Sequence, residues 1–134
     1  MGNSNFIRQK GNYEELLCYK KSVCVYDVTY YFAHKFLKIG DRTIDQMVQA
    51  ARSGKQNIVE GCSASTTSAE TEIKLLNVAK ASLKELLEDY KDYLRVRGLQ
   101  QWSEDCEKHI QARRACAVHN EPGYYSDAIK ERSD

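Results

Sequence analysis

The sequence predicts an all-α fold, an antiparallel up-down-up-down four-helix bundle, from three observations. Apolar residues recur at spacings of three and four residues through most of the chain, as they do on the buried face of a helix. The single proline, Pro122, lies near the C-terminus, so the residue type that breaks helices most strongly is missing before it. The segments between the periodic stretches are short, and short connections join helices that run antiparallel.

The first helix is expected over residues 14–39, which contain neither glycine nor proline. Gly40 is expected to stop it, because glycine readily takes the left-handed conformation found just after a helix. Residues 1–12 are polar and are expected to be a flexible lead-in to the bundle domain, residues 13–120. One stripe of this helix follows three/four spacing at Leu17, Lys21, Cys24, Val28, Tyr31 and Lys35.

The second helix is expected to start at Asp41 or Thr43 and to end at Gly61. Small residues on one face let another helix approach closely. They are Ala50, Ala51, Ser53 and Gly54.

The third helix is expected to begin at a capping box formed by Thr67 and Glu70, in which each side chain satisfies a free N–H of the first turn. It is expected to end at Arg97 and Gly98, a basic last turn followed by a stop. Its seam consists of Ile73, Leu76, Leu83, Leu87, Tyr90 and Leu94.

The fourth helix is expected to be capped by Ser103 and to end at residues 120–123. Its apolar stripe is weak. Residues 121–134 are expected to be a C-terminal tail, and the sequence leaves open whether the tail docks on the bundle.

Charge and cysteine content narrow the function classes. The 20 basic and 19 acidic residues nearly cancel, which argues against binding nucleic acid by bulk electrostatics. The five cysteines show no CxxC pair, and no apolar run resembles a signal peptide or a membrane span. A cytoplasmic protein with free thiols is therefore expected.

Two separated motifs carry a family resemblance. The first contains Gln49, Arg52, Ser53, Asn57, Ile58, Glu60 and Gly61; the second is Ala-Lys-Ala-Ser-Leu-Lys-Glu-Leu at residues 79–86, which includes Ser82 and Glu85. With these motifs the chain resembles the bacterial four helix bundle protein family, also described as proteins encoded by intervening sequences in 23S ribosomal RNA genes. That family is similar to the accessory variability determinants of diversity-generating retroelements.

The resemblance implies an antiparallel four-helix bundle that assembles as a homopentamer. The retroelement accessory proteins bind a reverse transcriptase and its RNA through a strongly basic surface, and the balanced charge of this chain departs from that pattern. The resemblance therefore implies fold and assembly first, with nucleic-acid binding second.

The motif residues support two interpretations. Asn57 and Glu60 lie one turn apart on a helix, and Arg52 is placed to pair with an acidic residue of the third helix such as Glu85. One interpretation is a polar pocket or partner contact. The other is a structural network that fixes the register of the helices.

The aromatic run Tyr30-Tyr31-Phe32 points in three successive helix directions, which one bundle core cannot bury. A contact with another subunit is therefore expected there. Basic residues near the tyrosines suit RNA, and they equally suit a solvated face beside a subunit interface. The candidate nucleic-acid contacts are Lys20, Lys21, Lys35, Lys38, Arg42, Arg113 and Arg114.

No catalytic constellation, phosphate-binding loop or metal-ligand spacing is apparent in the sequence, so an enzyme, a cofactor and a metal are not expected. The expected function is a non-enzymatic oligomeric scaffold or adaptor that binds a protein or nucleoprotein partner. The alternative is an RNA- or DNA-binding accessory protein. No membrane association is expected.

Overall fold

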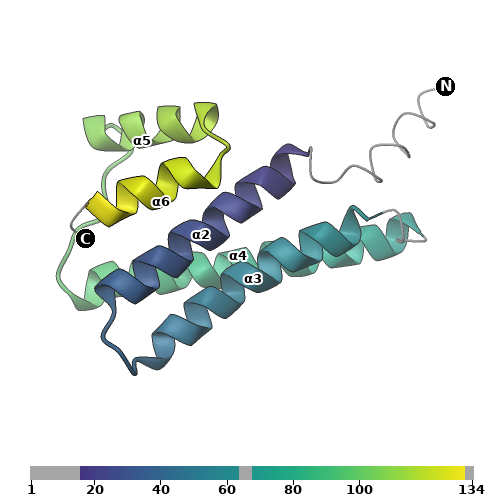
Figure 1. Ribbon diagram of the computed structural model, residues 1–134, viewed down its shortest axis with the longest axis horizontal. Helices are drawn as coiled ribbons and strands as arrows, with labels where there is room; N and C mark the ends of the chain where they lie inside the picture. The colour runs from purple at the N-terminus through teal and green to yellow at the C-terminus, as the bar shows by residue number, and fades with distance from the viewer. Residues whose placement is uncertain (1–15, 64–67, 132–134) are drawn as a thin grey trace.

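The computed structural model describes residues 16–63 and 68–131, and over these ranges the chain forms five α-helices and no β-strand (Figure 1). The all-α class predicted from the sequence is confirmed. The predicted lead-in, residues 1–12, lies outside the described residues. The helices are α2 (Leu17–Phe36), α3 (Arg42–Gly61), α4 (Ala69–Val96), α5 (Glu107–Val118) and α6 (Pro122–Glu131).

The main core lies where α2, α3 and α4 pack together. Met47 of α3 is fully buried there, and burial of such a side chain stabilises the fold by about 1.5–3 kcal/mol. Gly54 allows α3 and α4 to approach closely, since a Cβ added to it would lie 2.7 Å from Cδ2 of Leu83. The buried members of this core are Ala33, Leu37, Met47, Ala50, Ala51, Leu86 and Tyr93.

Local capping signals set the ends of α3 and α4. The Asp41 side chain accepts a hydrogen bond from the Thr43 N–H at 2.9 Å, and α3 ends at Gly61, as predicted. At the start of α4 the N-cap is Ser68, whose hydroxyl accepts from the Thr71 N–H at 3.1 Å. The predicted capping residue, Thr67, lies outside the described residues.

The end of α2 differs from the prediction. The helix stops at Phe36, because the backbone at Leu37 is already extended (φ −96°, ψ 147°). Gly40 instead takes φ +92° within the connection to α3, a conformation that favours glycine. Gly40 therefore shapes the turn between the two helices and does not terminate the first one.

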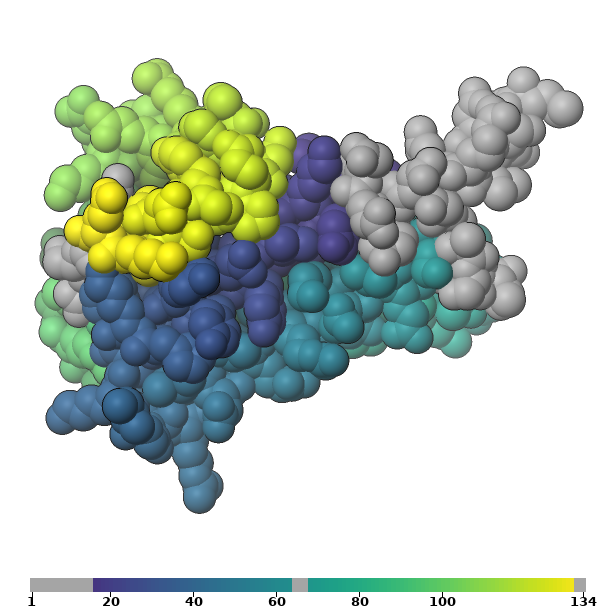
Figure 2. Space-filling model, viewed as in Figure 1, coloured from purple at the N-terminus to yellow at the C-terminus, as the bar shows by residue number. Residues whose placement is uncertain are grey.

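The C-terminal region forms a helical hairpin of α5 and α6, and α6 packs on α2. α5 begins at Glu107, not near Ser103, and has no buried residue. α6 falls within the predicted tail, residues 121–134, and packs on α2. Helices α2 and α6 run parallel to each other. Cys24, early in α2, contacts Asn120 just before α6, and Lys35, late in α2, contacts Ile129 near the end of α6. Figure 2 shows α6 lying over α2.

The docking of α6 explains the stripe that the sequence predicted for the first helix. Lys21 donates a hydrogen bond to the Cys116 carbonyl, the Cys24 thiol lies 3.4 Å from the Asn120 carbonyl, and Lys130 lies over the ring of Tyr31. This stripe therefore faces the α5–α6 hairpin. A different face of α2, which includes Thr29 and Ala33, meets α3 and α4.

The aromatic run finds partners within the chain. Phe32 packs against Tyr90 and Tyr93 of α4, with ring centroids 5.1 Å and 4.9 Å away. Tyr31 is half-buried beneath α6, and Tyr30 is 43% exposed. Phe32 faces α4 on one side of α2, and Tyr31 faces α6 on another side. Two members of the aromatic run are therefore packed within a single chain. The predicted subunit contact stays a prediction, with Tyr30 as its most exposed member.

Candidate functional site

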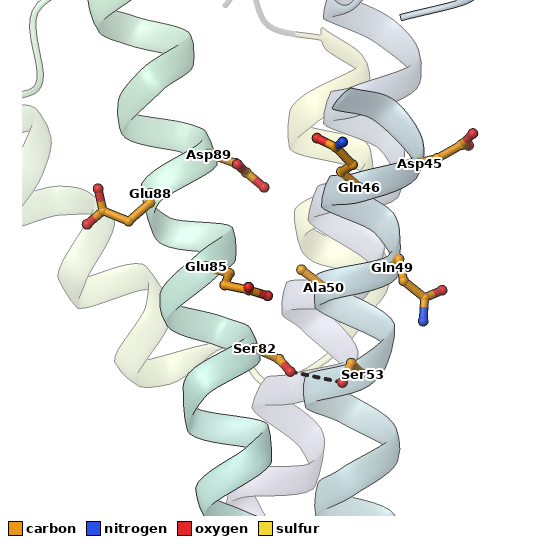
Figure 3. A pocket seen from close by; sticks show the side chains of 9 residues that line it. All are labelled: Asp45, Gln46, Gln49, Ala50, Ser53, Ser82, Glu85, Glu88 and Asp89. Atoms are coloured by element: carbon orange, nitrogen blue, oxygen red, sulfur yellow. Dashed lines mark hydrogen bonds between the residues drawn. The ribbon is translucent and has the colours of Figure 1, made fainter. Parts of the chain in front are cut away.

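Four of the predicted motif residues line one open groove between α3 and α4. Gln49 and Ser53 come from α3, and Ser82 and Glu85 come from α4 (Figure 3). The groove has a volume of about 700 Å³. Its other lining residues are Asp45, Gln46, Ala50, Glu88 and Asp89.

Helical spacing explains why these residues meet. Positions three or four apart lie on one face of a helix, and the lining positions 46, 49/50 and 53 of α3 and 82, 85 and 89 of α4 follow that spacing. Because α3 and α4 are neighbours, their two polar faces border the same groove.

The floor of the groove is small and polar. Ala50 and Ser82 are 8% and 9% exposed. The hydroxyls of Ser53 and Ser82 hydrogen-bond each other at 2.9 Å across the two helices. The Asn57 amide donates to the Ser53 carbonyl at 2.8 Å and lies 3.3 Å from the Ser53 hydroxyl. This network ties α3 to α4 beneath the open groove.

The groove is acidic, with four carboxylates and no basic residue in its lining. Glu85 and Asp89 point into the groove, whereas Asp45 and Glu88 lie at its rims and point outward (Figure 3). Glu88 pairs with Lys91 at 3.6 Å. Over residues 16–63 and 68–131, Asp45, Glu85 and Asp89 have no ion pair.

The electrostatics of Asp89 reflect this surplus of negative charge. Burial raises the pKa of Asp89 above its ordinary value, and the neighbouring carboxylates of Asp92 and Glu85 raise it further. A ligand that brings positive charge would relieve the repulsion between carboxylates. In the described part of the chain no group of three or more His, Cys, Asp or Glu side chains is placed to hold a metal ion. The groove therefore presents negative charge that its own lining does not neutralise.

The other motif residues lie outside the groove. Arg52 is exposed on α3 and makes no ion pair with Glu85 in the described structure. Glu60 is exposed near the end of α3. Gly61 is buried where α3 meets α4, and a Cβ added there would lie 3.3 Å from Cβ of Leu75. Arg52 and Glu60 therefore lie on the surface, whereas Gly61 contributes to the packing of α3 against α4.

Two of the predicted nucleic-acid contacts bind the protein's own backbone. Lys21 donates to the Cys116 carbonyl in the last turn of α5, and Lys35 donates to the Ile129 and Lys130 carbonyls at 2.6 Å and 2.9 Å. Cations are favourable at helix C-termini, where free carbonyls carry partial negative charge. Both lysines therefore position the α5–α6 hairpin.

The remaining basic candidates come from three segments of the chain. Lys20 is half-buried near the start of α2, and Lys38 and Arg42 are exposed around the α2–α3 connection. Arg113 and Arg114 are exposed on α5.

Sequence reasoning missed Asp45, Gln46, Glu88 and Asp89 as groove residues. On their own helices they look like any solvated face, and only the pairing of α3 with α4 brings them together. The available signal was the neutral or acidic character of positions 45, 46, 49, 85, 88 and 89, between basic neighbours at 42, 52, 84 and 91.

Comparisons of the chain with protein-family models, with curated proteins and with solved structures found no match. None of the helices in the described residues is long and apolar enough to cross a membrane.

Proposed function

We propose that this protein is a non-enzymatic, self-associating scaffold that holds a basic protein segment in the α3–α4 groove. The observation that carries the proposal is the groove itself, which combines four carboxylates with no basic lining residue. The resemblance to the four helix bundle protein family supports an antiparallel bundle assembled as a homopentamer. The proposal places the protein in the cytoplasm, where its five free cysteines would remain reduced.

The shape of the groove favours a helical ligand. Its floor contains Ala50, Ser53 and Ser82, and small residues allow another helix to come close. Glu85 and Asp89 of α4, which point into the groove, complement arginine and lysine on the incoming helix. The proposal assigns a binding role to these serines: the Ser53 and Ser82 hydroxyls bond each other, and among the described residues neither is hydrogen-bonded to a base that would activate it.

The test is the binding of a lysine- and arginine-rich helical peptide, followed by fluorescence anisotropy. Replacing Glu85 by Gln and Asp89 by Asn together removes the two inward charges and keeps the side-chain shapes. We expect affinity to fall about tenfold, since each exposed charge contributes up to about 1 kcal/mol. Raising the salt to about 0.5 M should weaken wild-type binding as well.

The matched control is Glu104→Gln with Asp105→Asn, which removes two exposed carboxylates from the segment before α5. It changes the net charge equally and should leave affinity unaltered. Equal losses in both double variants would mean that the peptide responds to overall charge, and the groove would then have no specific role.

The competing function is binding of RNA or DNA as an accessory protein. Arg113 and Arg114, both exposed on α5, are the observation that favours it. A structured RNA tested at low salt and at about 0.5 M salt decides between the two functions, because phosphate contacts weaken steeply with salt. Salt-sensitive RNA binding that is lost in Arg113→Gln/Arg114→Gln, together with no peptide binding, would favour the nucleic-acid role.

A further inference from the structure

Helix α5 carries an outward face that combines basic, apolar and small residues. Ile110, Arg113, Arg114 and Ala117 follow the i, i+3, i+4, i+7 spacing of a single helix face. All four are exposed, and Ile110 is 37% exposed. Within the part of the chain that the structure describes, neither arginine has a hydrogen bond or an ion pair. This face has the chemistry of a docking surface that its own chain leaves uncovered.

Helix α5 has little packing support within its own chain. The helix has 12 residues and none of them is buried. Helices of this length are marginal in water unless packing supports them. On one side α5 is held by the contact of Lys21 with the Cys116 carbonyl. Packing on its outward side would supply support that the single chain does not.

The α3–α4 groove complements this face in charge. Glu85 and Asp89 point into the groove without an ion pair among the described residues (Figure 3). Arg113 and Arg114 bring two positive charges on adjacent positions of α5. Arginine forms paired hydrogen bonds with carboxylates, so two arginines and two carboxylates match in number and chemistry.

The two surfaces also match in shape and length. The lining of α3 extends from Asp45 to Ser53, about 12 Å at 1.5 Å per residue. The face of α5 extends from Ile110 to Ala117, about 10 Å by the same measure. Ala117 is small, as is Ala50 on the groove floor, so the two helices can approach closely at these positions.

The two surfaces cannot meet within one chain. The groove is lined only by α3 and α4, whereas the α5–α6 hairpin packs on α2 (Figure 1). Each copy therefore presents one basic helix face and one acidic groove at different sites. Joining the two sites between copies gives a head-to-tail contact, which closes into a ring or continues as a filament.

From these observations we infer that the ligand of the α3–α4 groove is helix α5 of a second copy of this chain, with Arg113 and Arg114 set against Glu85 and Asp89. The inference rests on the proposed binding role of the groove and names its partner.

The test is charge reversal on each surface, followed by mass measurement with light scattering at tens of micromolar. Arg113→Glu/Arg114→Glu should weaken self-association at least about tenfold, and Glu85→Arg/Asp89→Arg should do the same. Mixing the two variants should restore association, because each variant's α5 then meets a groove of opposite charge. The variants must alternate, so the mixture should form even-numbered rings or open chains and not a ring of five. Circular dichroism checks that each variant keeps its helical content.

The matched control is Lys38→Glu/Arg42→Glu, which reverses two exposed charges around the α2–α3 connection. It changes the net charge as Arg113→Glu/Arg114→Glu does, and it should leave the assembly intact. Assembly that weakens equally in this control would overturn the specific pairing.

The outcomes separate this inference from the proposed function. A monomeric wild-type protein, or an oligomer indifferent to Arg113→Glu/Arg114→Glu, overturns the self-docking of α5. If the groove variant Glu85→Gln/Asp89→Asn still loses the basic peptide, the groove keeps its proposed role with another ligand. Arginine variants that lose only RNA binding would also overturn self-docking and would assign the α5 face to nucleic acid.

Discussion

Thr29 and Tyr90 form a polar contact inside the packing of α2 against α4. Their hydroxyls lie 2.8 Å apart, and Thr29 is completely buried. Thr29→Val keeps the side-chain shape but leaves the Tyr90 hydroxyl without its partner. We expect the free energy of unfolding, measured with urea, to fall by about 1–3 kcal/mol.

The double variant Thr29→Val/Tyr90→Phe removes both hydroxyls, so no unpaired polar group remains. It should cost less than the sum of the two single variants, because the pair is coupled. Strictly additive losses would show that the two hydroxyls do not depend on each other.

The ionisation of Tyr90 gives the protein a stability limit at high pH. Burial raises the pKa of Tyr90 to about 12, while the Thr29 hydroxyl opposes the shift. An unfolded tyrosine ionises near pH 10, so between pH 10 and 12 the unfolded state binds fewer protons than the native state and stability falls. The loss should be about 2–3 kcal/mol across that range.

Tyr90→Phe is the comparison for this pH dependence, because the other tyrosines titrate in both proteins. The difference in unfolding free energy between wild type and variant should shrink by about 2–3 kcal/mol from pH 10 to pH 12. A difference that stays constant with pH would mean that Tyr90 ionises at its ordinary pKa in the native protein.

Among the elements, α6 has its C-terminal end held by a hydrogen-bonding side chain of α2. Lys35 donates to the Ile129 and Lys130 carbonyls, which the helix itself leaves unpaired. Lys35→Met keeps most of the aliphatic chain and removes the ammonium group. We expect hydrogen exchange in the last turn of α6 to accelerate about two- to fivefold, as befits an exposed contact of 0.3–1 kcal/mol.

Lys38→Met is the control for this variant, since Lys38 is exposed in the connection that follows α2. It should leave exchange in α6 unchanged. If both lysine variants accelerate α6 equally, the effect comes from net charge and the contact at the helix end contributes nothing.

The sequence predicted α3 more accurately than α6 because the signals for α3 are local. Asp41 and Gly61 mark its two ends within the segment itself. The docking of α6 depends instead on Lys21, Cys24 and Lys35, whose partners lie more than 90 positions further along the chain. Helical periodicity identified the face that carries these residues, but periodicity does not say which helix will cover it.

The two sequence motifs contained Gln49, Ser53, Ser82 and Glu85, which line the groove, but the groove itself was not predicted. The polar pocket considered from the sequence rested on Arg52, Asn57 and Glu60, which are not among the lining residues. Glu85 and Asp92 lie within one turn of Asp89 on α4, so their proximity was readable from the spacing. Asp89 was missed because its burial and its place in the groove depend on the packing of α3 against α4.

On the scale of the whole molecule, the helices differ in how much of their surface is buried. The buried core joins α2, α3 and α4, α6 packs on α2, and α5 buries no residue. Regions with few buried apolar contacts open at low free energy, whereas core helices open only with the whole fold. In a single chain α5 should therefore be the first helix to exchange its amide hydrogens, and the amides of α3 and α4 among the last.

Because α5 buries no residue in the single chain, its hydrogen-exchange rate can be used to detect self-association. If α5 docks in the groove of a second copy, its amides gain protection in proportion to the fraction of copies that are docked. Exchange in α5 should then slow as protein concentration rises from about 1 μM to about 100 μM, while exchange in the buried centre of α3 stays the same. The measurement is hydrogen exchange followed by mass spectrometry of peptides from both helices.

Arg113→Glu/Arg114→Glu supplies the internal comparison, because its α5 should exchange rapidly at every concentration. Adding Glu85→Arg/Asp89→Arg to the same chain restores opposite charges on the two surfaces and should restore the concentration dependence. If the oligomer mass rises with protein concentration while the hydrogen exchange of α5 stays constant, that result would place the subunit contact outside α5. The exposed ring of Tyr30 on α2 would then be the surface to test, since the adjacent Tyr31 and Phe32 are covered within their own chain.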